Sequence, residues 1–458
     1  MDSKLQLGSA AGRGTLIAAV LASGMAFLDS TIVNVALPSL GRELKADLAQ
    51  LQWVVNGYTL TLAAFVLLGG ALGDRLGRRR IFMLGIAWFT LASIACGLAQ
   101  SAEMLIAARI VQGAGAALLT PGSLALIQSS FQHDVRSKAI GAWSGLSGVT
   151  TAIGPFVGGL LIDQASWRWI FWMNVPLAAL ALWLCVKYVP DSRDEQAPAR
   201  FDVAGAMLGA LALAGVTYWL IQPRGVLWAL IGGILAAIGF VAVERARRER
   251  AMMPLHLFSS RVFSGLNLYT ILVYGSFGGL FFLLAIYLQN ALGYSALAAG
   301  AATVPVTLLL LAFSAWSGAL AGKIGPRPQL IAGPLLCALG AVLLRFAGGN
   351  YLTTVLPGVT VFGIGLTLLV APLTATVLGA VADRYAGLAS GINNAAARAA
   401  SLLAVAALPL VIGLSGTEYA DPAPLTAAFQ DATLWCAGGL AAGSLIAVLT
   451  CPPHLRSA

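Results

Sequence analysis

Long apolar runs constrain this sequence more than any other feature. About fourteen of them approach or exceed the roughly 20 residues that a helix needs to cross the hydrocarbon core of a bilayer. Inside a bilayer only helices and closed barrels satisfy their own backbone hydrogen bonds, and runs of this length indicate helices. The expected spans are 14–38, 51–72, 81–99, 102–126, 137–162, 168–189, 203–222, 226–243, 262–289, 297–321, 328–347, 352–378, 385–414 and 431–451. We therefore predict an all-α, polytopic membrane protein.

Charge and composition support this prediction and exclude other classes. Only 10% of the residues are charged and 59% are hydrophobic, whereas about 25% of the residues in soluble proteins are charged. The basic residues recur in short loops rather than in one patch, which argues against nucleic-acid binding. If the N-terminus is cytoplasmic, 20 of the 27 basic residues lie on that side, so both termini are predicted to be cytoplasmic. The first run is too long for the core of a signal peptide and is interpreted as a retained helix.

Cysteine, histidine and nucleotide-binding patterns give no sign of a metal, a cofactor or an ATPase. The five cysteines are far apart and mostly inside apolar runs, with no CxxC or Cys/His spacing. The three histidines fall in polar connections, so a histidine proton relay within the membrane is not expected. No GxxxxGK[ST] stretch is present for ATP. We predict no cofactor and no metal site.

A basic loop occurs twice. GALGDRLGRRR, residues 70–80, follows the second span, and GALAGKIGPRP, residues 318–328, follows the tenth. The same loop at the same point of two halves suggests a duplicated six-helix unit. We predict an N-terminal six-helix bundle at 1–190, an inserted helical pair at 191–260 and a C-terminal six-helix bundle at 261–458.

Two ionisable residues lie inside spans and are candidate functional residues. Asp29 interrupts the first apolar run within LDSTIVNVALPSL, and Arg109 lies in the fourth. A charge in the hydrocarbon region is costly and indicates function, although a structural hydrogen bond between helices is the alternative. Arg109 needs an acid, backbone carbonyls or water as its partner. Asp29 is the only acid well inside a span, but the sequence does not show that the two meet.

Two glycine-containing stretches suggest moving parts. In the first basic loop the glycines permit a tight turn, and the acid can pair with the arginines or with the N-terminus of a neighbouring helix. A solvated loop at the cytoplasmic face is the alternative. The loop residues of interest are Gly70, Asp74, Arg75, Gly77, Arg78 and Arg79. The fifth span carries a seam of small residues suited to close helix packing, namely Gly141, Gly145, Gly148, Ala152, Pro155 and Gly159.

Taken together, these stretches resemble the major facilitator superfamily, specifically its fourteen-helix drug:proton antiporter branch of the multidrug efflux type. LDSTIVNVALP is similar to the first-helix signature of that branch, and GALGDRLGRRR is similar to motif A. The run from Arg109 through Gln112 and Gly113 resembles motif B, and GPFVGG, residues 154–159, resembles the antiporter motif C. SWRWIFWMNVP, residues 166–176, is similar to the segment that leads the sixth helix. The likeness is dense in the N-terminal half and looser in the C-terminal half.

The resemblance implies export of amphiphilic drugs or related small molecules across the cytoplasmic membrane of a bacterium, in exchange for protons and by alternating access. It assigns proton coupling to Asp29 and Arg109 and a gate to the loop of Asp74. It also implies that motif C specifies antiport, through Gly154, Pro155, Gly158 and Gly159. We expect a monomer whose partners are the substrate, protons and membrane lipid.

The balance of charge bears on the substrate. One acid against two bases, Arg109 and Arg398, argues against dicationic substrates and favours neutral, monocationic or zwitterionic ones, while Arg398 is also compatible with an anion. Aromatic residues suit a broad apolar site, although each also suits ordinary packing. The candidates for the cavity wall are Trp53, Asn56, Tyr58, Trp143, Tyr274, Phe277, Phe281 and Arg398.

Other functions remain as alternatives. A proton-coupled importer or a dedicated metabolite exporter of the same fold would share the helix pattern, and motif C argues against import. A membrane-embedded enzyme would need a nucleophile, a metal or paired acids near the bilayer surface, and no such set is evident in the spans. A sensor that transports nothing is the third alternative. We predict that the chain is not an enzyme.

Overall fold

The computed structural model describes residues 5–193, 202–222, 224–247, 251–382 and 385–452, and these residues are helical almost throughout. The helices are α1 (Ala10–Leu44), α2 (Leu48–Leu76), α3 (Arg78–Gly97), α4 (Ala102–Ser130), α5 (His133–Gln164), α6 (Trp169–Trp172), α7 (Asn174–Tyr188), α8 (Val203–Ile221), α9 (Leu227–Arg247), η2 (Leu255–Ser259), α10 (Arg261–Asn290), α11 (Ala296–Ala302), α12 (Val304–Ile324), α13 (Arg327–Leu344), η3 (Tyr351–Val355), α14 (Leu356–Gly379), α15 (Ala386–Val411), η5 (Glu418–Ala420) and α16 (Pro422–Thr450).

Within the described residues, 14 helical stretches are long and apolar enough to cross a membrane, which confirms the predicted polytopic all-α fold. Three of them contain a break, because α6 continues into α7, α11 into α12 and η3 into α14. The break at Thr303 precedes Pro305, whose ring lacks an N–H and disfavours helical backbone at the preceding residue. Most helices extend beyond the predicted limits. The first begins at Ala10, capped by Ser9, and ends at Leu44.

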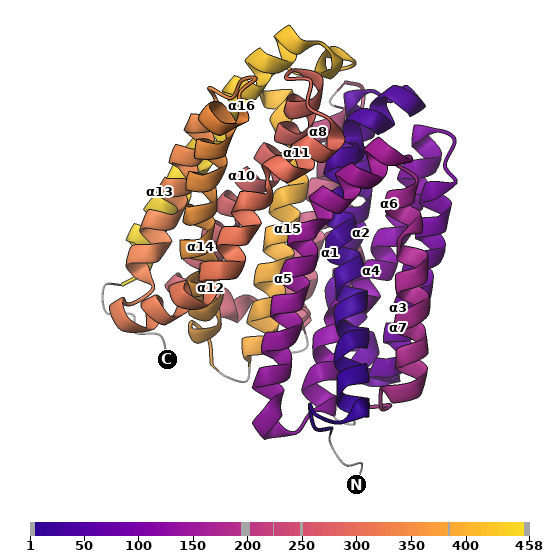
Figure 1. Ribbon diagram of the computed structural model, residues 1–458. Helices are drawn as coiled ribbons and strands as arrows, with labels where there is room; N and C mark the ends of the chain where they lie inside the picture. The colour runs from indigo at the N-terminus through magenta and orange to yellow at the C-terminus, as the bar shows by residue number, and fades with distance from the viewer. Residues whose placement is uncertain (1–4, 194–201, 223, 248–250, 383–384, 453–458) are drawn as a thin grey trace.

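The helices form two groups that lie side by side (Figure 1). Helices α1 to α7 form the N-terminal group, in which α4 packs on α2 and α3 and α1 packs on α5 and α7. Helices α10 to α16 form the C-terminal group, built on the pairs α13 with α14 and α10 with α16. We call the end of the bundle where α1 begins and α16 ends the basal end, and the other the distal end. The basal end is the lower one in Figure 1.

The predicted inserted pair lies against both groups. Helices α8 and α9 pack on each other, and α8 also contacts α2 and α15. An aromatic row connects them, since the ring of Trp53 lies 5.9 Å from Tyr218, which lies 6.0 Å from Trp228. The outward face of α9 exposes large apolar side chains, as expected for a surface in contact with lipid. The pair therefore covers one side of the boundary between the groups.

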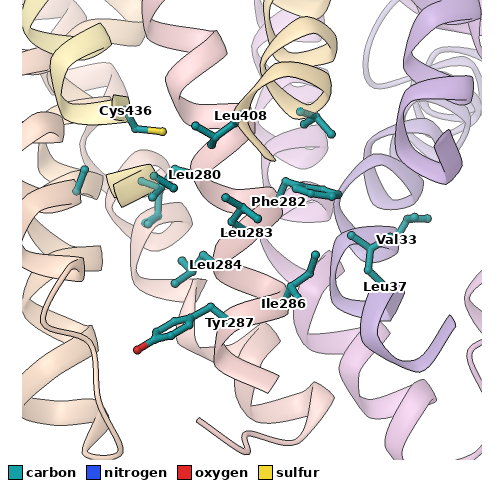
Figure 2. Close-up of a cluster of buried hydrophobic side chains, with 14 of the residues drawn as sticks. Val33, Leu37, Leu280, Phe282, Leu283, Leu284, Ile286, Tyr287, Leu408 and Cys436 are labelled. Atoms are coloured by element: carbon teal, nitrogen blue, oxygen red, sulfur yellow. The ribbon is translucent and has the colours of Figure 1, made fainter. Parts of the chain in front are cut away.

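The buried core is continuous from one group to the other. Figure 2 shows part of this core, where Phe282 and Ile286 of α10 face Val33 and Leu37 of α1. On its other side, α10 places Tyr287 on Phe429 of α16, with ring centroids 4.1 Å apart and nearly parallel. Lipid tails are as apolar as these side chains, so packing contacts rather than exclusion of water stabilise this core.

The two repeated loops make the same contact in their respective groups. Arg79 at the start of α3 donates to the carbonyl of Val186 in α7 at 3.0 Å, and Arg327 at the start of α13 donates to the carbonyl of Val448 in α16 at 3.2 Å. The preceding turns are also alike, since Gly77 and Gly325 both have positive φ, +108° and +81°. Residues without a Cβ adopt this backbone most readily. The contact supports equivalence of the two loops.

Candidate functional site

A buried ion pair connects two helices inside the N-terminal group. Asp29 of α1 accepts hydrogen bonds from Nη1 of Arg109 and, at 2.9 Å, from Nε2 of Gln112, both of α4. The side chains of Asp29 and Arg109 are each 1% exposed. The two residues named from the sequence therefore meet, together with the glutamine of the motif B stretch.

The Arg109 guanidinium has several further partners. Its Nε donates to the carbonyl of Val54 at 3.1 Å, Nη1 also donates to Oε1 of Gln112 at 2.7 Å, and the group lies 4.3 Å from the centre of the Tyr58 ring. Burying a charge is tolerated only when partners of this kind compensate it. A proton on Asp29 would neutralise the carboxylate and leave the charge of Arg109 uncompensated. The cluster can therefore act as a charge switch.

The sequence around Arg109 explains how α4 reaches this position. Arg109, Gln112 and Gly113 share one face of the helix. A Cβ atom at Gly113 would lie only 2.2 Å from the carbonyl oxygen of Tyr58, so only glycine permits α4 to approach α2 so closely. This close approach brings the guanidinium to Val54 and Tyr58.

The small-residue seam of α5 faces two different neighbours. Cβ atoms at Gly154 and Gly158 would meet Thr31 and Ile32 of α1, at 2.4 and 2.7 Å, so these glycines pack α5 within the N-terminal group. A Cβ at Gly159 would lie 2.5 Å from the carbonyl oxygen of Ala296 in α11, which belongs to the C-terminal group.

Further along the seam, the carbonyl oxygen of Pro155 lies 2.1 Å from where a Cβ on Gly300 of α11 would be. Near the basal end, Cβ atoms at Gly141 and Gly145 would meet nothing within 4 Å, and the side chain of Ala152 lies outside the described part of the chain. Pro155 and Gly159 thus lie where the two groups touch, whereas Gly154 and Gly158 pack on α1.

The loop of Asp74 makes local contacts at the basal end. Asp74 accepts from Nε of Arg78, one helical turn away, at 2.7 Å. The N–H of Arg78 donates to the carbonyl of Ser192 at 2.8 Å, while Arg75 is exposed in the last turn of α2. Gly70 packs on Pro121 of α4.

The N-terminal cavity candidates lie in varied surroundings. Trp53 packs on Tyr218 of the inserted pair, and Trp143 donates to Oγ of Ser23 at 3.0 Å, which ties α5 to α1. Tyr58 is buried over Arg109. Asn56 is fully buried, and its side-chain amide has no hydrogen-bond partner among the described residues.

The C-terminal candidates lie on α10 and α15. Phe277 and Phe281 form an aromatic cluster with Phe362 of α14, with centroids 4.6 to 6.2 Å apart. Tyr274 lines a small cavity of about 70 Å³ between α10, α14 and α15. Arg398 is half-buried on α15 and close enough to Tyr58 to interact with it electrostatically.

A set of polar contacts that the sequence reasoning missed joins the two groups at the distal end. The carboxylate of Asp163, in the last turn of α5, accepts the N–H groups of Ala296 and Leu297 at the start of α11, at 3.1 and 2.8 Å. Gln52 donates to the carbonyl of Val405 at 2.7 Å, and Gln289 donates to the carbonyl of Val35 at 2.9 Å. We call these contacts the distal seal. An acid is unfavourable at the C-terminal end of its own helix, and that anomaly was the available signal for Asp163.

Tyr419 of η5 completes the distal seal. Its hydroxyl donates to the carbonyl of Ala46 at 2.7 Å. Burial and the nearby Asp47 carboxylate raise the pKa of the Tyr419 phenol above its ordinary value of about 10. The phenol therefore remains a neutral donor over the physiological pH range, and this contact is not sensitive to protons there.

Comparison with known proteins identifies relatives of similar length. The sequence profile of the Major Facilitator Superfamily matches residues 19–405. The chain is 38% identical to the multidrug resistance protein Stp of Mycobacterium tuberculosis over 90% of its own length and 79% of Stp. It is 34% identical to the tetracenomycin C resistance and export protein of Streptomyces glaucescens, over 87% and 75% of the two chains. It is 35% identical to the puromycin resistance protein pur8 of Streptomyces alboniger, over 92% and 86%.

Solved structures of low sequence identity share the fold. A bacterial homologue of the human lysosomal transporter Spinster, in an inward-facing and unoccupied conformation, superposes with a TM-score of 0.70 at 18% identity, over 97% of both chains. A POT family transporter in complex with a peptide conjugate superposes with a TM-score of 0.73 at 13% identity, over 96% of this chain and 95% of the other. Identities of this size establish the architecture of the helices and no more.

Proposed function

The chain belongs to the Major Facilitator Superfamily, in its fourteen-helix branch related to drug-resistance exporters, and we propose that it exports amphiphilic small molecules in exchange for protons. The observation that carries this proposal is the sealed cluster of Asp29, Arg109 and Gln112. A carboxylate without contact to water in one state can exchange protons only when the helices move, which is the requirement for coupling proton flow to conformational change.

The position of the distal seal supports alternating access. Hydrogen bonds between the two groups gather at the distal end, and the groups also pack there through α5 and α11. The basal end carries the first basic loop, whose Asp74 pairs within its own group. We infer that the basal end is cytoplasmic and that this conformation is open toward the cytoplasm. Opening outward would then break the distal seal and close the basal end.

Proton-driven flux is the test of the proposed function. We would reconstitute the purified protein in liposomes, impose a pH gradient, and follow a panel of neutral, monocationic, zwitterionic and anionic dyes. A difference of one pH unit provides about 1.4 kcal/mol per proton, enough to drive a measurable concentration ratio. We expect dye movement opposite to proton flow that an uncoupler abolishes. Dye movement in the same direction as the protons would instead identify an importer.

Replacing Asp163 by alanine is expected to weaken the distal seal. The carboxylate accepts two backbone N–H groups, and losing a cap of this kind costs about 0.5 to 2 kcal/mol. The population with an open distal end should rise accordingly. Spin labels at Gln100→Cys and Thr417→Cys, both exposed at the distal end, would report the distance between the groups, and the five native cysteines are buried.

Asp163→Asn is the matched variant, because its amide oxygen retains one acceptor and should give an intermediate shift. The role of the carboxylate in the seal is wrong if Asp163→Ala leaves the distance distribution unchanged.

A further inference from the structure

Arg398 is a charge at the middle of a membrane span that has no partner in the described part of the chain. It lies halfway along α15, and it forms no hydrogen bond or ion pair with the described residues. An arginine in the hydrocarbon region needs an anion, carbonyl groups or water to compensate its charge. The charge of Arg109, by comparison, is compensated by a carboxylate, a carbonyl group and an aromatic face.

Arg398 is near the N-terminal group. The side chain is partly exposed rather than fully buried, so a ligand can reach it. Tyr58 of the N-terminal group lies within electrostatic reach of both Arg109 and Arg398. Helix α15 also packs on α2, the helix that carries Tyr58. Arg398 is therefore directed toward the N-terminal group.

Neutral hydrogen-bonding side chains line a cavity beside this part of α15. Ala397 lines the cavity of about 70 Å³, together with the Tyr274 phenol and the Asn394 amide. Asn394 is exposed one turn before Arg398 on the same face of α15. These neighbours can donate to a ligand, but none of them carries a negative charge that would compensate the guanidinium.

Asp29 cannot supply the missing negative charge. Both of its carboxylate oxygens accept hydrogen bonds from α4, and the Arg109 guanidinium already balances its charge. The centre of the molecule thus contains a neutral pair and one free positive charge. A cationic substrate would be repelled there, whereas a substrate with an acidic group would compensate Arg398.

We propose that Arg398 is the binding site for an acidic group of the exported substrate, a carboxylate or an ionised phenol carried by an aromatic amphiphile. This inference rests on the proposed export function and narrows it to zwitterionic and anionic substrates. The planar guanidinium can hold such a group with two parallel hydrogen bonds. Asn394, one turn before Arg398 on the same face of α15, provides a further donor.

Equilibrium binding of matched dyes tests this proposal without a proton gradient. Rhodamine 110 carries a free carboxylate, and rhodamine 123 is its methyl ester; rhodamine B and its ethyl ester form a second pair. Fluorescence polarisation with the purified protein in a non-ionic detergent gives both affinities. We expect each acid to bind about 10- to 100-fold more tightly than its ester, because charged hydrogen bonds contribute about 1.5 to 3 kcal/mol.

Variants then assign the preference to one residue. Arg398→Gln should remove the preference for the acid without lowering affinity for the ester, while Arg398→Lys should keep part of the preference. Arg224→Gln is the matched control, since it removes one exposed positive charge far from the cavity. Wild-type protein that binds neither acid, or binds acid and ester equally, overturns the proposal whatever the variants do.

A preference for the acids that persists in folded Arg398→Gln also overturns it. The proposed function is tested separately. A clear preference for the acid combined with no proton-driven flux would count against antiport, but not against Arg398 as a binding site.

Discussion

Asp29→Asn should bind substrate as the wild type does and lose proton-driven efflux to the background level. Asparagine keeps the size of the side chain and an oxygen that can accept from Gln112, but it cannot take up or release a proton. Without that step, the imposed pH gradient cannot drive the transport cycle. Substrate exchange between equal concentrations needs no net proton movement and should persist.

The measurement compares two assays in the same liposomes: efflux driven by a pH gradient, and exchange of labelled for unlabelled dye without one. Asp29→Glu is the matched control, since it keeps a titratable carboxyl. Full gradient-driven efflux in Asp29→Asn would refute the role of Asp29 in coupling.

Stability must be separated from coupling, because the substitution leaves Arg109 buried without its acid. Breaking one side of a buried ion pair costs about 3 to 5 kcal/mol. The double variant Asp29→Asn with Arg109→Gln removes both charges, so we expect it to recover thermal stability and remain uncoupled. Recovery of stability without recovery of efflux would show that the lost proton site, and not poor folding, causes the defect.

The ion pair shows what the sequence could and could not predict. A single acid and an arginine inside apolar runs are conspicuous because burying a charge in the hydrocarbon region is energetically costly. Both residues were therefore identified from composition and position alone. Their contact was not predictable, because they lie 80 residues apart and nothing in either run specifies how α1 and α4 are rotated. The same limit applies to Gln112, which the sequence marked as part of the motif B stretch without showing its contact with Asp29.

The helices themselves were predictable because length and hydropathy determine them, and all fourteen were identified. The ends of the helices were less predictable, because polar caps such as Ser9 extend helices beyond the apolar run. The distal seal was missed for a related reason. Asp163 and Gln52 lie at helix ends, where polar residues usually face water, and their partners are backbone groups that carry no side-chain signal.

Gly300→Val should trap the transporter with its distal end open. A Cβ at Gly300 would lie 2.1 Å from the carbonyl oxygen of Pro155, and backbone on both sides leaves no side chain that can rotate away. The two groups must separate to admit the valine. Overpacking of this kind costs about 1 to 3 kcal/mol, which shifts a two-state equilibrium about 5- to 150-fold.

In an outward-open state α5 and α11 are separated, so that state should tolerate the valine. The state described here should not. The spin-label pair at Gln100→Cys and Thr417→Cys should report a longer distance in Gly300→Val, and proton-driven efflux should fall sharply because the cycle must pass through both states. Gly145→Val, on α5 where a Cβ meets nothing within 4 Å, is the matched control and should leave the distance unchanged. If Gly300→Val instead transports normally with an unchanged distance, α5 and α11 do not separate during the cycle. The motif C glycines would then serve packing alone, and the conformational change would have to occur at another boundary between the groups.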